Sequence, residues 1–292
     1  MRAFALPLAT AILWGLNYHF AKRMIVAAPF AEVGLWRYAL AVGALGVVGA
    51  RTLPPWQTLR PHLPAILRIG SLALFGFNLG YFLGLRSTSP LNASLIMALN
   101  PATTVALSGV WLGTRVRPAQ LAGLLVSLLG VAYLVFDGSV SAALALEVNP
   151  GDVFILGANV CFAVHHVLVR RDGGALPNAS FTLLINVACL GSFAMLLPVM
   201  GVAPSIFHDG DFWGAALCFG VLGTGLAYLL WNAGVARLGA DTCALFLNVA
   251  PLATAVGSVV LGEPLFAKHF ISGGLILGGL LLSQLGIPRG RR

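Results

Sequence analysis

Charged side chains are scarce in this sequence. Seventeen Lys and Arg residues and nine Asp and Glu residues make up 9% of the 292 residues, whereas soluble domains carry roughly 25%. So few charges cannot cover the surface of a water-soluble domain, and the mean hydropathy of +0.92 is correspondingly high. The composition therefore predicts an integral membrane protein and excludes a hidden soluble domain.

Sequence signatures of enzymes are also missing. There is no GxxxxGK[ST] phosphate loop, no HExxH or GxSxG motif, and no pair of aspartates within an apolar run. The four cysteines lie in different apolar runs and form no CxxC pair. His165 and His166 are adjacent, so on a helix their side chains diverge by about 100° and do not chelate one ion. We therefore expect neither an enzyme nor an ATP-driven pump, and we expect no cofactor and no metal site.

Long charge-free runs account for most of the chain. Nine such runs are present, and a tenth is interrupted only by Arg37. Each is close to or longer than the roughly 20 residues that span a hydrocarbon core, and none shows the alternating pattern of a membrane β-barrel strand. We predict an all-α integral membrane protein with ten transmembrane helices, over residues 3–21, 33–50, 69–85, 87–114, 118–136, 153–169, 173–208, 212–236, 242–262 and 269–288.

The few charges are distributed unevenly between the two sides of these helices. With the N-terminus in the cytoplasm, the cytoplasmic segments carry twelve basic and two acidic residues, and the outer segments carry four basic and seven acidic ones. This distribution follows the positive-inside rule, so the net charge of +8 does not require a nucleic-acid partner. We expect both termini in the cytoplasm, the first run retained as a helix rather than cleaved as a signal peptide, and the lipid bilayer as the partner of the apolar surface.

The chain repeats itself at a shift of about 150 residues, which places Pro101 on Pro251. We divide it into a first five-helix repeat, residues 1–136, a periplasmic linker, residues 137–151, and a second five-helix repeat with a short basic cytoplasmic tail, residues 152–292. Because five is odd, the second repeat enters the membrane from the opposite side. Inverted repeats of this kind are common in secondary transporters, whose substrate sites lie near the midplane between the repeats.

Both repeats carry a proline near the middle of a predicted helix. Pro101 is expected to free the carbonyl of Met97, and Pro251 that of Leu247, because proline has no N–H to donate. We expect the two prolines to bend their helices, as hinges or as fixed bends. An asparagine lies next to each bend, where its amide could bond a freed carbonyl or a ligand: Asn100 and Asn248.

Glycine is abundant, with 35 residues, and small residues allow membrane helices to approach closely. Gly76, Gly80 and Gly84 predict one helix-packing edge. Gly274 and Gly278 predict another.

Five short motifs occur in order along the chain: LWGLN at 13–17, LWRY at 35–38, GLAYLLWN at 225–232, APL at 250–252 followed by LGE at 261–263, and a glycine-rich run at 273–279. Together they resemble the EamA-type permeases of the drug/metabolite transporter superfamily, and within it the aromatic amino-acid exporters of the YddG kind. The halves also differ, since Thr114 stands where the second half has Glu263, and Cys161-Phe162-Ala163 replaces the Trp-Gly pair of the first helix.

The resemblance implies a secondary transporter of small organic solutes. It suggests that aromatic or neutral amino acids, or related metabolites, move outward across a bacterial inner membrane by alternating access through a midplane pocket. An exporter of cationic or aromatic drugs through the same pocket is the alternative. A channel and an intramembrane enzyme are further classes, and the enzyme would need a catalytic cluster that the sequence lacks. We expect the chain to act as a monomer.

Polar and aromatic residues at helical spacing mark candidate pocket walls. Asn78 and Tyr81 share one helix face, and the second repeat has Tyr228 and Trp231 at the same spacing. Such groups suit a ligand with an amino-acid backbone and an apolar or aromatic side chain, although interhelical packing also explains them. The candidate substrate-binding residues are Trp14, Asn17, Asn78, Tyr81, Met97, Asn100, His166, Tyr228, Trp231 and Asn248.

Arg37 is the only charge deep within a predicted helix, and such residues are functional candidates. Glu32, five residues away, is too poorly spaced to pair with it on one helix face. Arg37 could instead bind a substrate carboxylate or a freed carbonyl, or act as a structural tether whose charge reaches the interface. His166 and His19 are either packed histidines or proton-coupling groups facing the cavity.

Overall fold

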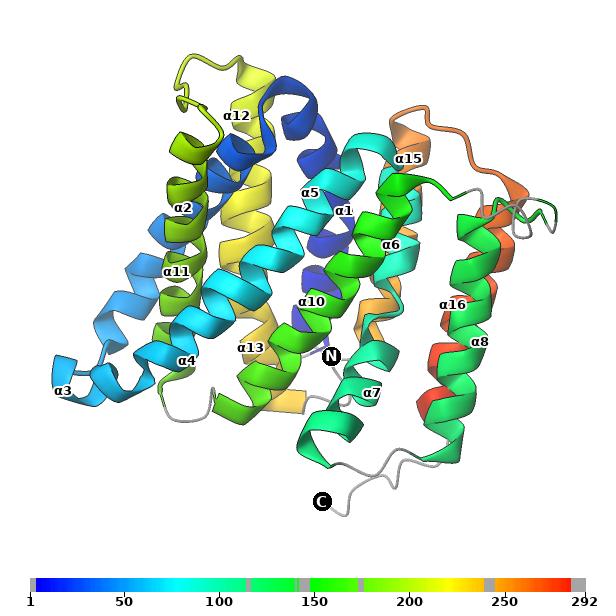
Figure 1. The fold of residues 1–292 in the computed structure, drawn as a ribbon, viewed down its shortest axis with the longest axis horizontal. Coiled ribbons are helices and arrows are strands. Elements are labelled where there is room, and N and C mark those ends of the chain that lie inside the picture. Colours follow the sequence, from blue (N-terminus) through cyan, green and yellow to red (C-terminus); the bar gives the residue numbers. More distant parts are fainter. Residues whose placement is uncertain are drawn as a thin grey trace.

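The computed structural model describes residues 4–113, 117–139, 141, 148–172, 176–238 and 245–284. Within these residues every regular element is helical (Figure 1). In chain order they are α1 (Ala5–Ala27), α2 (Phe30–Gly49), η1 (Ala50–Thr52), α3 (Trp56–Leu59), η2 (Arg60–His62), α4 (Leu63–Leu67), η3 (Arg68–Leu74), α5 (Phe75–Ser87), α6 (Pro90–Met97), α7 (Asn100–Leu112), α8 (Pro118–Val135), α10 (Pro150–Asp172), α11 (Asn178–Val199), α12 (Gly210–Leu217), η5 (Cys218–Leu226), α13 (Ala227–Leu238), η6 (Leu245–Asn248), α15 (Val249–Val260) and α16 (Ala267–Gln284).

These elements make up the ten predicted membrane helices. Seven helical stretches within the described residues are long and apolar enough to cross a membrane, and two shorter apolar helices lie in α15 and α16. The remaining one, α1, has 23 residues. Four stretches are composite: α3 to α5, α6 with α7, α12 with α13, and η6 with α15. The all-α membrane fold is confirmed.

Helix ends differ most from the charge-free runs at two places. The run 173–208 predicts one very long helix, but α11 ends at Val199 and Gly201 follows with a left-handed φ of 63°, a conformation that suits glycine. The third helical stretch begins at Trp56 rather than at residue 69, because helical structure continues past Arg60 and Arg68 outside the apolar segment. Absence of charge thus locates helices better than it locates their ends.

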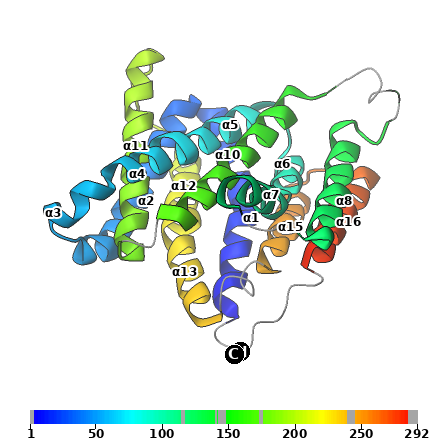
Figure 2. The same ribbon diagram turned by 60° about the horizontal axis from the view of Figure 1, so that its bottom comes forward.

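The helix contacts show the inverted repeat directly. In the first half α1 packs against α13 and α15, and in the second half α10 packs against α5 and against α6 and α7. The two sets correspond helix by helix: α1 to α10, α13 to α5, and α15 to α6 with α7. Two further contacts join corresponding helices of the two repeats, since α2 lies against α11, and α8 lies against α16 at one edge of the bundle (Figure 2).

The contact between α8 and α16 is symmetric at the level of single residues. A Cβ atom added to Gly130 would lie 2.9 Å from the carbonyl oxygen of Ser272, and one added to Gly279 would lie 2.5 Å from that of Gly123. Ser127 also donates a 3.1 Å hydrogen bond to the carbonyl of Ile276. Backbones this close leave no space for a side chain, so glycine is required at both positions.

The glycine edges predicted from sequence have different outcomes. Added Cβ atoms on Gly80 and Gly84 would meet backbone carbonyls of α10 at 2.9 Å and 2.8 Å, so this edge is a helix contact. The predicted edge of Gly274 and Gly278 is wrong, because added Cβ atoms there meet nothing within 4 Å. Gly279, on another face of α16, makes the close contact.

The two prolines lie where helices restart. α6 ends at Met97, Ala98 and Leu99 form a turn, and α7 begins with Asn100, so Pro101 occupies the first helical turn. Pro251 follows the η6–α15 junction by two residues. Proline is tolerated at these positions because the first N–H groups of a helix have no partner within it. The expected bend in the first repeat is a break between two short helices.

A side chain from the other repeat bonds the carbonyls at the first break. The Asn159 amide of α10 donates to the carbonyls of Ile96 at 3.2 Å and Met97 at 3.5 Å. Asn100 donates back to the carbonyl of Asn159 at 3.0 Å. The carbonyl that Pro101 frees therefore finds its partner in Asn159 rather than in Asn100. The side chain of Asn248 lies outside the described part of the chain.

Two π-helical segments, η3 and η5, occupy corresponding places in the two repeats. Each presents a glycine to the neighbouring helix: Gly70 faces the carbonyl of Ile185 at 2.5 Å, and Gly220 faces that of Arg37 at 2.7 Å, measured from an added Cβ. π-Helical turns are rare and frequently occur at functional sites. η3 leads directly into α5, and η5 leads directly into α13.

The close backbone approach at Gly279 predicts a large cost for a side chain at this position. We expect Gly279→Leu to separate α8 from α16 and to destabilise the protein by about 1–3 kcal/mol. Gly274→Leu is the matched control, because it adds the same side chain to an open position of the same helix. Thermal unfolding of the purified proteins should show a lower midpoint for Gly279→Leu alone; equal midpoints for the two variants would contradict the packing.

Candidate functional site

A cavity of ≈ 260 Å³ lies between the two repeats. It receives side chains from helices of both halves and runs beside both helix breaks. Eleven of the residues singled out from the sequence line it: Trp14, Asn17, Arg37, Tyr81, Met97, Asn100, Pro101, His166, Tyr228, Trp231 and Pro251. Its volume is near the lower end of the about 300–1,000 Å³ typical of small-molecule sites.

One wall of the cavity joins α1 to α13 through aromatic rings. The Trp14 ring centroid lies 5.7 Å from that of Tyr228 and 5.3 Å from that of Trp231. Thr10 and Asn17 fix the helices behind these rings by donating to the carbonyls of Ala227 at 3.2 Å and Gly223 at 3.1 Å. The rings are therefore held on two helices whose relative position is set by buried hydrogen bonds.

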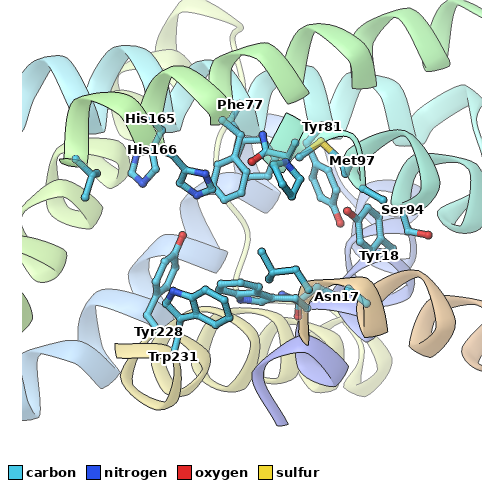
Figure 3. A pocket seen from close by; sticks show the side chains of 18 of the residues that line it. Asn17, Tyr18, Phe77, Tyr81, Ser94, Met97, His165, His166, Tyr228 and Trp231 are labelled. Carbon is cyan, nitrogen blue, oxygen red and sulfur yellow. The ribbon is translucent and has the colours of Figure 1, made fainter. Parts of the chain in front are cut away.

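The opposite wall joins α10 to α5 in the same manner. Phe162 stacks on Phe77 with centroids 4.5 Å apart and lies 4.3 Å from His166. Figure 3 shows His165, His166, Phe77 and Tyr81 on one side of the open space and Tyr228 and Trp231 on the other. Flat rings on both walls form a slot that suits an aromatic or apolar ligand group.

Sequence reasoning did not select Phe77 and Phe162 as site residues. Phe162 is the counterpart of Trp14, since a shift of 148 residues aligns Cys161-Phe162-Ala163 with Leu13-Trp14-Gly15. This correspondence could have identified Phe162 from the sequence, because Trp14 was itself a candidate site residue. Phe77 has no such counterpart, since the residue 150 positions later is Ala227.

At one end of the slot the walls touch. Tyr18 meets Tyr81 edge to face, with centroids 5.4 Å apart, and Ser94 lies beside them (Figure 3). Beyond this pair, the Lys22 ammonium donates to the carbonyls of Leu85 and, at 3.1 Å, Thr88, at the end of α5. We call these contacts of Lys22 the α1–α5 closure.

The other end of the cavity extends further. Val169 and Asn178, on either side of the α10–α11 connection, line it. Their counterparts at a shift of 148 residues are Ala21 and Phe30, which do not. The cavity is therefore asymmetric although the scaffold is symmetric. It reaches the end of the bundle that holds the α10–α11 connection and stops short of the opposite end.

Arg37 lines the cavity while remaining 7% exposed. Its Nε donates to the Thr224 hydroxyl at 3.2 Å, and its Nη1 donates to the side-chain oxygen of Asn78. The guanidinium carbon lies 3.9 Å from the Phe219 ring centroid. Asn78 is fully buried behind Arg37 and does not line the cavity. Its position is that of a support for the arginine.

Glu32 does not pair with Arg37, as their spacing indicated. It accepts hydrogen bonds of 2.7 Å from the Ser205 N–H and 3.3 Å from the Trp36 indole, and lies 2.7 Å from the His208 ring nitrogen. These bonds hold the segment after α11 against the start of α2.

The histidines differ in surroundings. His166 and His165 both line the cavity, and His165 packs parallel to Phe162. His19 is buried and lies 2.9 Å from the Thr254 carbonyl of α15, a helix-to-helix contact rather than a cavity position. No cluster of three or more His, Cys, Asp or Glu side chains that could hold a metal occurs within the described residues.

Comparison with known proteins gives matches along the length of the chain. The model of the EamA-like transporter family matches residues 1–136 and 149–285. An uncharacterized transporter, YyaM, of Bacillus subtilis (strain 168) is 30% identical over 288 residues, covering 97% of this chain and 94% of the relative. A solved crystal structure superimposes with a TM-score of 0.67 at 25% identity, over 97% of this chain and 96% of that chain.

Two relatives have names that state a substrate. The aromatic amino acid exporter YddG of Ancylobacter novellus is 28% identical over 214 residues, 73% of each chain. A probable terminal-alkyne amino-acid exporter of Streptantibioticus cattleyicolor is 26% identical over 288 residues, 94% of this chain and 90% of the relative. Together with the membrane fold and the family match over both halves, these similarities identify a transporter of small solutes. The chain belongs to the EamA-like transporter family.

Proposed function

We propose that the protein exports aromatic or neutral amino acids, or closely related metabolites, across the bacterial inner membrane. The observation that carries the proposal is the cavity between the repeats, which both halves line with aromatic rings and which lies beside both proline-containing breaks. The names of two relatives as amino-acid exporters support the substrate class. The chain works as a monomer in this proposal, because each copy contains both repeats and its own cavity.

Transport proceeds by alternating access, in which the halves rock about the central site. Pro101 and Pro251 are the proposed hinges, since the helix breaks beside them interrupt the regular hydrogen-bond ladder. The asymmetry of the cavity supports this mechanism, because repeat symmetry supplies a second arrangement in which the opposite end is open. Lys22 and its counterpart Arg170, which is exposed in this structure, are the residues whose contacts would exchange.

The charge distribution supports an orientation with both termini in the cytoplasm. In this orientation the α10–α11 connection is cytoplasmic, so the cavity described above reaches toward the cytoplasm. The α1–α5 closure then seals the periplasmic side. A substrate collected from the cytoplasm would enter this arrangement without a prior conformational change.

An exporter of flat cationic or aromatic drugs is the second candidate. The observation that favours it is the same pair of aromatic walls, because ring faces attract cations as well as apolar groups.

Counterflow tests the proposed substrate class. Purified protein in vesicles preloaded with unlabelled phenylalanine should accumulate labelled phenylalanine transiently above its external concentration, because a carrier exchanges substrate faster than it loses the gradient. Protein-free vesicles are the control. A channel gives no overshoot, an enzyme gives a new product, and absence of overshoot and binding for all twenty amino acids would reject amino-acid transport.

The aromatic wall of α13 should contribute directly to substrate affinity. We expect Trp231→Ala to raise the KM for phenylalanine about 2- to 10-fold, since an aromatic contact is worth about 0.5–1.5 kcal/mol. Trp111→Ala is the matched control, because Trp111 is 51% exposed on α7 and does not line the cavity. Initial rates of exchange give the comparison, and equal KM values in both variants would place the site elsewhere.

Lys22 should hold the periplasmic side closed. We expect Lys22→Gln to increase the labelling rate of a cysteine placed at Ser94 by an impermeant thiol reagent roughly 10-fold, because charge-assisted hydrogen bonds contribute about 1.5–3 kcal/mol. The experiment uses the full chain with its natural cysteines replaced, in intact cells. Arg23→Gln is the control, as it removes the neighbouring charge from an exposed position; similar labelling in both variants would contradict the role of the α1–α5 closure.

A further inference from the structure

We propose that Arg37 is the anion-binding end of the cavity and that the transported solute must carry a carboxylate, whereas an amino group is not required. This inference rests on the proposed function and names the chemical feature that its substrates share. It also separates the two candidate functions, because a cationic drug has no group for this site.

Arg37 places a permanent charge within a membrane helix, α2. A charge in the middle of a membrane helix is expensive and is retained where it has a partner or a function. Arg37 is 93% buried in α2, the complement of its 7% exposed fraction. The protein therefore bears this cost without the compensation of full hydration.

The repeat symmetry shows that the scaffold does not need an arginine at this position. The carbonyl of Arg37 packs against Gly220, and the carbonyl of Ile185 packs against Gly70 in the same way. Ile185 is therefore the counterpart of Arg37, at a shift of 148 residues, and it also lines the cavity. The same helix contact forms around an aliphatic side chain, so the charge has a purpose other than packing.

The neighbours of Arg37 orient the guanidinium without neutralising it. The Asn78 amide donates to the Tyr38 hydroxyl and to the Leu74 carbonyl, both at 2.7 Å, so its oxygen faces Arg37. The Thr224 hydroxyl donates to the Phe219 carbonyl at 3.0 Å, which leaves its oxygen free to accept from Arg37. Both acceptors are neutral. Such a fixed guanidinium is suited to bind a carboxylate.

No counter-charge compensates Arg37 within the described residues. Glu32, the nearest acid in sequence, is bonded to His208 and the Ser205 N–H. No described acidic side chain lines the cavity or forms an ion pair with Arg37. Among the described residues that line the cavity, Arg37 is thus the single permanently charged one, and its charge is positive.

One nitrogen of the guanidinium remains available. Nε and Nη1 make the protein contacts, whereas Nη2 has no hydrogen bond within the described residues and is not among the buried atoms that lack a partner. It therefore keeps some exposed surface, and Arg37 lines the cavity. A carboxylate there would receive a charge-assisted hydrogen bond and supply the missing counter-ion.

The other end of a ligand faces different chemistry. The rings of Trp14, Tyr228 and Trp231 offer apolar faces, and the described lining residues include no acidic side chain to select an ammonium. The walls therefore accept the aromatic part of a ligand whether or not it has an amino group.

Three ligands of similar size test this division: 3-phenylpropionate has only the carboxylate, phenethylamine has only the ammonium, and phenylalanine has both. Calorimetric titration of the purified full chain should show binding of the two acids and roughly 10-fold or weaker binding of phenethylamine. This comparison needs no variant, so it remains decisive where a substitution prevents folding. Phenethylamine binding as tightly as 3-phenylpropionate would overturn the inference.

Substitution of Arg37 assigns the effect to the residue. Arg37→Gln should weaken binding of both acids roughly 10- to 100-fold, leave phenethylamine unchanged, and retain the melting temperature. Arg37→Lys should restore part of the affinity. Arg51→Gln is the matched control, because Arg51 is an exposed arginine of η1 just beyond the same helix.

The outcomes separate the inference from the proposed function. Binding of 3-phenylpropionate that depends on Arg37, without phenylalanine exchange in vesicles, would support the anion site and reject amino-acid transport. Normal phenylalanine exchange by Arg37→Gln would support amino-acid transport and reject the anion site, leaving Arg37 as a structural tether.

Discussion

The structure depends on one constraint of the membrane: every backbone carbonyl in the hydrocarbon core needs a partner within the protein. Pro101 leaves the carbonyl of Met97 without a helical partner, and Asn159 from the opposite repeat donates to it as well as to the neighbouring carbonyl of Ile96. A single buried amide thus joins the two repeats at the point where one helix is broken. The break is tolerated because its polar groups face protein and the cavity rather than lipid.

The cavity follows from how closely the helices approach around this break. Glycines on η3, η5, α8 and α16 bring backbones together at positions that correspond in the two halves, so the helices are tightly packed at these contacts. At the cavity the walls are large rings, with Trp14 packed on Tyr228 and Trp231 and Phe162 packed on Phe77. The space for a ligand lies between these two aromatic walls.

The sequence was sufficient to predict the features that rest on local chemistry. Charge-free runs located ten helices, and the correspondence of Pro101 with Pro251 revealed the inverted repeat. Contacts between distant residues were not predictable in this way. Asn159 gave no local signal of its role, since its partners lie about 60 positions earlier. The π-helical turns of η3 and η5 have no sequence signature, and Gly279 rather than Gly274 forms the close contact because the rotation of α16 is set by α8.

Repeat symmetry and ligand recognition place different requirements on the two halves, and the pair of Arg37 and Ile185 shows how the proposed mechanism would meet both. The proposed alternating access requires two similar arrangements, and the backbone contacts of the halves do match, down to the carbonyls that face Gly220 and Gly70. A solute with one polar and one apolar end requires unlike walls. The chain places the difference in side chains that project into the cavity and keeps the matching contacts in the backbone. In the proposed mechanism a symmetric motion can then act on an asymmetric ligand, because the matching backbone contacts do not depend on which side chain projects into the cavity.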